Sequence, residues 1–105
     1  MMSSVDIGSI GERIVAQELV SKGYRTNVDT KLPGSTDIEA KSSAANLLVQ
    51  VKTAVSPNQP ASLSSDEERN IKARATKISY QAWEAKVQLN ESYKLIGKIV
   101  WRKLS

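Results

Sequence analysis

Residues 36–53 read TDIEAKSSAANLLVQVKT and contain two short patterns that are separated by a polar turn. Residues 36–40 alternate carboxylates with Ile38, and residues 46–53 are rich in aliphatic and β-branched side chains. Both patterns are typical of short strands, and the intervening residues 41–43 are typical of a turn. We therefore expect two neighbouring strands here.

Four side chains that could carry chemistry lie on these two strands. Asp37 and Glu39 share one face of the first strand, and Gln50 and Lys52 share one face of the second, because successive side chains alternate between faces. Neighbouring strands lie about 4.8 Å apart, so Asp37, Gln50 and Lys52 could meet at one point. The alternative is a solvated polar face on an edge strand, with Lys52 as an exposed partner of the carboxylates.

The sequence before this stretch predicts a helix and another strand. Helical spacing of apolar residues predicts a helix over residues 8–22, and a strand follows over residues 24–28. A turn is expected at residues 32–35. Glu12 lies on the packed stripe of the helix, where a carboxylate is costly without a partner. The alternative is that Glu12 reaches water and favours the positive end of the helix.

The sequence after this stretch predicts a loop, a helix and two strands. Residues 54–64 are loop-like, and two overlapping capping boxes, Ser64 with Glu67 and Ser65 with Glu68, begin a helix near Asp66. The helix is expected to end near Lys77, with Ile71, Ala75 and Ile78 on its inner face. Period-two alternation predicts strands over residues 80–89 and 93–104, which form a closing hairpin. The order is α-β-β-β-α-β-β, an α/β fold with a mixed five-stranded sheet, in a single domain over residues 1–105.

The composition excludes several kinds of chemistry. The 105 residues include no cysteine and no histidine, which excludes disulfide bonds, Ser-His-Asp triads and zinc sites of Cys or His. Apolar runs are too short to span a membrane, and the N-terminus has no signal-peptide pattern, so a cytoplasmic protein is expected. An enzyme of this composition would use carboxylates, amides and lysines, with a hard metal ion.

The charge is divided between two halves of the chain. Residues 1–68 contain 6 Lys or Arg and 9 Asp or Glu. Residues 69–105 contain 9 Lys or Arg and 2 Asp or Glu. The respective balances are −3 and +7, which sum to the formal charge of +4. This division suggests a phosphate-facing surface beside a carboxylate-bearing site, and the alternative is that the lysines and arginines only solvate exposed faces.

Three segments together resemble the PD-(D/E)XK nucleases, which have the restriction-endonuclease fold. They are Gly8-Ser9-Ile10-Gly11-Glu12 at the start of a helix, Gly34-Ser35-Thr36-Asp37-Ile38-Glu39-Ala40, and Gln50-Val51-Lys52-Thr53. Within that superfamily the sequence is most similar to archaeal Holliday-junction resolvases and small homing-type endonucleases. The resemblance covers residues 8–104, and it depends on the order and spacing of short motifs.

The resemblance implies a metal-dependent endonuclease that hydrolyses DNA phosphodiester bonds, at branched DNA or as a homing or restriction enzyme. It implies that Asp37 and Gln50 hold Mg²⁺ or Mn²⁺, and that Glu12 completes the metal shell directly or through water. Lys52 would orient or activate the attacking water. Mg²⁺ prefers oxygen ligands, so such a set is chemically suitable.

Gln50 departs from the usual motif, in which this position is commonly acidic. A glutamine oxygen can ligate a metal ion, but it brings no negative charge, and Glu39 could supply the missing charge. The alternative function is therefore a catalytically inactive nucleic-acid-binding module of the same fold. A third possibility is a protein-interaction domain whose acidic and basic halves pair between subunits.

Basic residues downstream could contact DNA phosphates. They are Arg69, Lys72, Arg74 and Lys77 on the second helix, and Lys94, Lys98, Arg102 and Lys103 on the hairpin. Trp83 and Trp101 could stack on bases, but their alternating apolar positions favour core or subunit contacts. Since so small a core cannot surround a duplex, we expect a homodimer or a higher homo-oligomer.

Overall fold

The structure, a computed structural model, describes the backbone of residues 4–32 and 35–105 and the side chains of residues 7–28 and 38–105. The described residues form the elements α1 (Ser4–Ser21), β1 (Arg25–Leu32), β2 (Ser35–Lys41), β3 (Asn46–Val55), α2 (Ser65–Lys77), β4 (Gln81–Leu89) and β5 (Val100–Lys103). The strands form one sheet in the order β1-β2-β3-β4-β5, in which β3 and β4 are parallel and the other neighbours are antiparallel. The predicted α/β fold with a mixed five-stranded sheet is confirmed.

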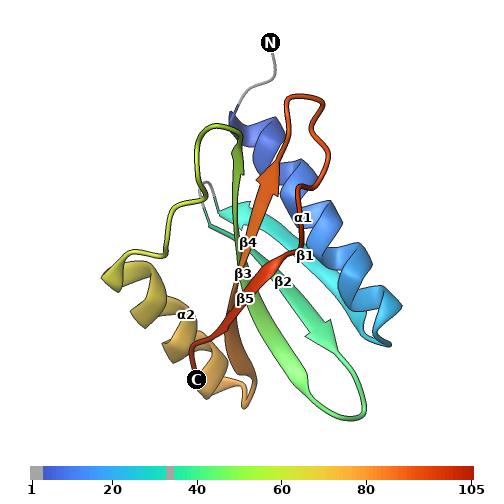
Figure 1. Cartoon of the computed structure of the whole chain (residues 1–105). Coiled ribbons are helices and arrows are strands. Elements are labelled where there is room, and N and C mark those ends of the chain that lie inside the picture. The colour runs from blue at the N-terminus through green and yellow to red at the C-terminus, as the bar shows by residue number, and fades with distance from the viewer. Residues whose placement is uncertain (1–3, 33–34) are drawn as a thin grey trace.

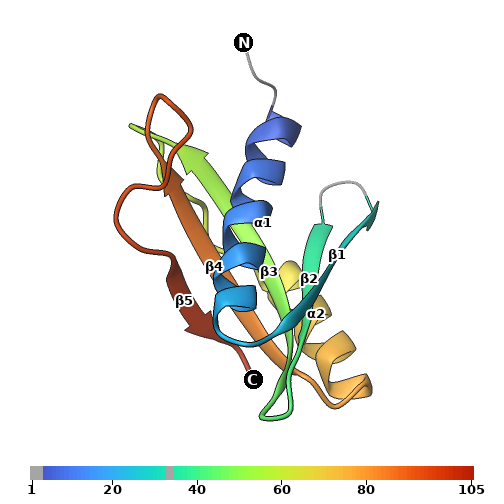
Figure 2. The same cartoon turned by 90° about the vertical axis from the view of Figure 1, so that its right-hand side faces the viewer.

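The two helices cover opposite faces of the sheet (Figure 1). Figure 2 shows α1 in front of the sheet and α2 behind it. Val15 of α1 packs in one apolar cluster with Val49 of β3. Ile71 of α2 packs in a second cluster with Leu48 of β3. Because successive residues of β3 point to opposite faces, the strand contributes to both clusters.

A glycine allows α1 to approach the centre of the sheet closely. A Cβ atom added to Gly11 would lie 2.9 Å from both Cβ and Cγ2 of Thr53. Real Cβ contacts are longer than this, so a larger residue would push the helix away from β3. Gly11 therefore sets the distance between α1 and the strand that carries Gln50 and Lys52.

The start of α2 follows one of the two predicted capping boxes. Ser64 is the N-cap, since its Oγ accepts from the backbone N–H of Glu67 and the Glu67 carboxylate accepts from the backbone N–H of Ser64. The box of Ser65 with Glu68 does not form, because Ser65 is already the first helical residue. Ile78 was wrongly predicted to face inward: it is the C-cap and 47% exposed, because the helix ends before it completes another turn.

The closing hairpin is less regular than predicted. The sequence predicts a strand over residues 93–104, but β5 spans only Val100–Lys103, and Leu95 forms an isolated bridge with Leu89. The backbone of Tyr93 and Gly97 has φ of 62° and 68°. Left-handed conformations interrupt a strand, so alternation alone overestimated its length.

Other boundaries differ by a few residues. α1 begins at Ser4 instead of residue 8, and β1 continues to Leu32 instead of residue 28. The predicted turn at residues 32–35 falls partly on residues outside the described set. The helices in the described part of the chain are too short or too polar to span a bilayer.

Candidate active site

The face of β3 that is turned toward α2 carries two of the predicted site residues. Gln50 and Lys52 lie on the same side of the strand as Leu48, which packs against α2, whereas Val49 and Val51 belong to the cluster on the α1 side. Gln50 is only 3% exposed, and the Lys52 side chain is 24% exposed. The predicted sharing of one face is therefore observed, and the pair lies at a partly buried position.

One carboxylate joins these two side chains to the start of α2. Oε2 of Glu67 accepts a hydrogen bond from Nε2 of Gln50 at 3.2 Å, and it forms an ion pair with Nζ of Lys52 at 2.8 Å. The other carboxylate oxygen, Oε1, accepts from the backbone N–H of Ser64 at 3.0 Å. The Lys52 ammonium, followed by the Ser64 N–H, lowers the pKa of Glu67, so this carboxylate stays ionised at neutral pH.

Asp37 lies beside this pair in the sheet. Its backbone is the register partner of Gln50, in the antiparallel pairing of β2 with β3. Residues directly opposite in such a pair point to the same face, about 5 Å apart. The side chain of Asp37 lies outside the described residues, so its predicted contact with Gln50 and Lys52 stays a prediction.

Glu39 is engaged further along the same sheet. Its backbone pairs with Leu48. Its Oε1 accepts from the Tyr80 hydroxyl at 3.3 Å and forms an ion pair with Nζ of Lys41 at 3.1 Å. Among the described carboxylates, the one bonded to Gln50 is therefore that of Glu67, which the sequence indicated only as a helix cap.

Glu12 is carried by the helix on the opposite face of the sheet. It follows Gly11, whose backbone packs against Thr53, the residue after Lys52. α1 therefore passes close to the part of β3 that carries the candidate site, although from the other side. A contribution of Glu12 to the site stays a prediction.

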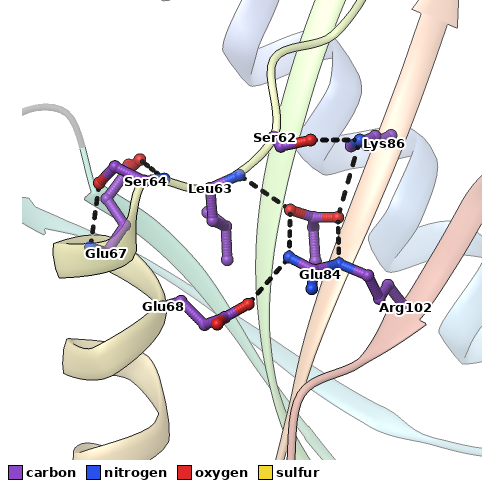
Figure 3. A network of polar contacts seen from close by, with 8 residues as sticks. All are labelled: Ser62, Leu63, Ser64, Glu67, Glu68, Glu84, Lys86 and Arg102. Carbon is purple, nitrogen blue, oxygen red and sulfur yellow. Dashed lines mark hydrogen bonds and ion pairs between the residues drawn. The ribbon is translucent and has the colours of Figure 1, made fainter.

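A second polar network holds the segment before α2 against the sheet (Figure 3). Glu84 of β4 is 1% exposed, and its Oε2 accepts from the backbone N–H of Leu63 at 2.9 Å. Its Oε1 accepts from Nε of Arg102 at 3.1 Å, and Nζ of Lys86 lies 4.0 Å away. Nη2 of Arg102 also forms an ion pair with Oε1 of Glu68 at 2.9 Å. The network therefore connects β4, β5 and the first turn of α2.

Opposing effects act on the pKa of Glu84. Burial raises it, but the hydrogen bonds from Arg102 and from the Leu63 N–H outweigh burial, and the resulting pKa lies below the usual range. In the sequence Glu84 stands between the apolar residues Trp83 and Ala85, a pattern that is typical of the solvent side of a strand. That side is covered by α2, and a central strand between two helical layers is buried on both faces.

Most of the predicted phosphate-contacting residues are exposed. Arg69, Lys72 and Lys77 are exposed on α2, Arg74 is half-buried, and Lys94, Lys98 and Lys103 are exposed near the C-terminus. Arg69 pairs with Asp66 at 2.9 Å, in a contact that solvent screens strongly. Arg102 is also exposed, although Glu84 and Glu68 both bind it, and its contact with phosphate stays a prediction.

The two tryptophans pack in the way that favours a core role. Trp83 and Trp101 meet edge to face, with ring centroids 6.2 Å apart, and both pack against the cluster on the α1 side. Nζ of Lys22 lies 5.7 Å from the centroid of the Trp101 ring. The expectation of core contacts agrees with this arrangement.

The donor atoms at the candidate site suit a hard cation. In the part of the chain whose side chains are described, no group of three acidic, histidine or cysteine side chains is close enough to hold a metal ion. The amide nitrogen of Gln50 donates to Glu67, the other atom of this amide is an oxygen, and the register position opposite Gln50 is Asp37. Oxygen donors of this kind fit Mg²⁺ or Mn²⁺.

Comparison with known proteins supports the architecture. No protein-family model and no curated protein sequence matches the chain. Among solved structures, the chain is similar to Hjc of Archaeoglobus fulgidus, a Holliday junction resolvase from an archaeal hyperthermophile. The TM-score is 0.74 at 22% sequence identity, over 92% of this chain and 72% of Hjc. The mixed sheet with its flanking helices is therefore the fold of that resolvase.

Proposed function

We propose that this protein is a metal-dependent endonuclease that cleaves DNA, with branched junctions as its preferred substrate. The observation that carries the proposal is the arrangement on β3: Gln50 and Lys52 lie side by side against Glu67, and the backbone of Asp37 pairs with Gln50. The fold shared with Hjc supports this assignment. An intracellular location is part of the same proposal.

The roles of the residues follow from their chemistry. Asp37 and Gln50 would hold Mg²⁺ or Mn²⁺ with oxygen atoms, and Glu12 would complete the shell directly or through water. The bound ion would polarise the scissile phosphate and favour ionisation of the attacking water. Lys52 would hold that water and offset the negative charge that develops on the phosphate, because an oriented ammonium stabilises charge most where water is scarce.

The surface beside the site would bind the DNA backbone. Lys72 and Lys77 are exposed on α2, the helix whose first turn contributes Glu67. Phosphate contacts by such residues provide affinity without sequence specificity. We also propose a homodimer, because two copies of the site would be needed to cut two strands of a junction.

Cleavage assays with end-labelled four-way junctions and linear duplexes test the proposal. The wild type is expected to cleave the junction in Mg²⁺ or Mn²⁺, and Lys52→Met and Asp37→Asn are expected to lose about 100-fold or more in rate. Lys41→Met is the matched control, since Lys41 pairs with Glu39 away from Gln50. Absence of cleavage by the wild type, or equal rates for Lys52→Met and Lys41→Met, would contradict the proposal.

The second candidate is an inactive nucleic-acid-binding module, which is favoured by the uncharged Gln50 at a position that commonly holds an acid. It predicts salt-dependent DNA binding without hydrolysis, and no increase in Tm when Mn²⁺ is added. Measured Mn²⁺ stabilisation would exclude it.

A further inference from the structure

The Glu67 carboxylate uses its two oxygens for different purposes. Oε1 completes the capping box with Ser64, and Oε2 accepts from both Gln50 and Lys52. A capping box needs only one side-chain oxygen, and glutamine satisfies it as well as glutamate. The cap therefore does not require the second oxygen or the negative charge, both of which are directed at the candidate site.

The position of Glu67 is enforced by its surroundings. Immediately before the helix, the N–H of Leu63 is bound by the buried Glu84 at 2.9 Å. Immediately after Glu67, Glu68 pairs with Arg102, which Glu84 also binds (Figure 3). The first turn of α2 is therefore attached to the sheet on both sides of Glu67, and the carboxylate is held toward β3.

We propose that Glu67 is the positioning acid of this site: it orients the Gln50 amide and the Lys52 ammonium, and it supplies the negative charge that Gln50 lacks. The inference rests on the proposed metal-dependent function. With its nitrogen donating to Glu67, the Gln50 amide leaves its oxygen for a cation. A carboxylate behind the ligand favours the cation electrostatically, as partners of metal ligands generally do.

Glu67→Gln removes the negative charge of residue 67 but keeps an acceptor for the helix cap. The glutamine can still accept from Ser64 N–H, so α2 should keep its start, but its amide group now faces two donors, Gln50 Nε2 and Lys52 Nζ. The readout is Mn²⁺ affinity of the full chain without DNA, measured by calorimetry. We expect Glu67→Gln to weaken Mn²⁺ binding by about 10- to 100-fold.

Glu68→Gln is the matched control. It removes the same charge from the adjacent residue of the same helical turn, which contacts Arg102 and not Lys52. The glutamine oxygen can still accept a hydrogen bond from Arg102, so the first turn of α2 keeps its attachment to the sheet. Mn²⁺ affinity is expected to change less than about threefold in this variant, because screened charges away from the ligands contribute little.

A charge exchange separates positioning from helix stability. In the double variant Glu67→Gln with Gln50→Glu, the hydrogen bond between positions 50 and 67 is restored with donor and acceptor reversed, and the total charge is unchanged. We expect Mn²⁺ affinity to return to within a few-fold of the wild type. Because an acidic ligand at position 50 would strengthen Mn²⁺ binding by itself, the rescue supports positioning only where Gln50→Glu raises the affinity more in the Glu67→Gln background than in the wild type.

The outcomes distinguish this inference from the function on which it rests. Loss of Mn²⁺ affinity in Glu67→Gln with recovery in the exchanged double variant supports the inference. If the wild type binds Mn²⁺ and Glu67→Gln binds it equally well, or if Glu68→Gln loses as much, the inference is overturned and the proposed function stands. If the wild type binds no Mn²⁺ and cleaves no DNA, the proposed function and the inference both fail.

Discussion

Replacing the buried carboxylate of Glu84 tests how the start of α2 is attached to the sheet. Glu84→Gln keeps the size of the side chain but removes the charge. Its amide has one oxygen and one NH₂ group, so one of the two donors that now bind the carboxylate, Leu63 N–H or Arg102, would face the NH₂ group. The oxygen can remain with Leu63 N–H, while Arg102, whose side chain is 50% exposed, loses its paired hydrogen bonds to residue 84 and keeps its ion pair with Glu68. One charge-assisted interaction is then lost, and we expect a cost of about 2 kcal/mol.

Glu84→Ala extends the same reasoning. It removes both acceptors, leaves the buried Leu63 N–H without a partner and opens a space at a position that is 1% exposed, so the expected cost rises to about 4 kcal/mol. Urea unfolding followed by tryptophan fluorescence measures both variants at pH 7. Glu91→Gln is the control, because Glu91 is exposed on a turn. A cost below about 0.5 kcal/mol for Glu84→Gln, within the range of ordinary surface substitutions, would refute the reasoning.

The same experiment has a defined pH dependence. The pKa of Glu84 is lowered in the folded state, below its ordinary value of 4.5. Its stabilising contribution is therefore fully present above pH 4.5 and is lost as pH falls through the lower, folded-state pKa. The stability difference between wild type and Glu84→Gln should shrink on acidification below pH 4.5 and stay constant between pH 6 and 8.

Two further predictions concern packing and DNA binding. Gly11→Ala should destabilise the fold by about 2 kcal/mol in urea unfolding, because its Cβ would overlap Thr53. Gly8→Ala, where the nearest atom is 4.0 Å away, should be neutral or stabilise by up to about 1 kcal/mol; equal effects of the two would contradict the packing argument. Lys72→Gln and Lys77→Gln should each reduce the slope of log affinity against log salt by about 0.9 in DNA-binding titrations, and an unchanged slope would show that these lysines do not contact phosphates.

Local patterns were sufficient to predict the elements of this fold. The helix at residues 65–77 begins at Ser64 because a capping box is encoded within four consecutive residues. Residues 46–53 could be predicted as a strand because aliphatic and β-branched side chains favour a pleated surface. The prediction failed for the C-terminal strand, where left-handed residues interrupt an alternating pattern, and for Ile78, where the helix ends. The residue at which a helix or strand ends depends on turns and on packing, which the hydrophobic period of the sequence does not predict.

The amino-acid sequence alone was enough to predict the fold class, the pairing of Gln50 with Lys52 on one face and the absence of histidine and cysteine chemistry. These properties follow from composition and from the two-residue period of a strand. The tertiary structure was needed to bring Glu67 to that pair, because Glu67 lies 17 positions after Gln50 in the chain, beyond the end of β3 and a loop. It was also needed to bury Glu84, since only packing of α2 on the sheet turns an alternating polar face into an interior. Contacts between distant segments depend on how helices cover the sheet, and no local pattern specifies them.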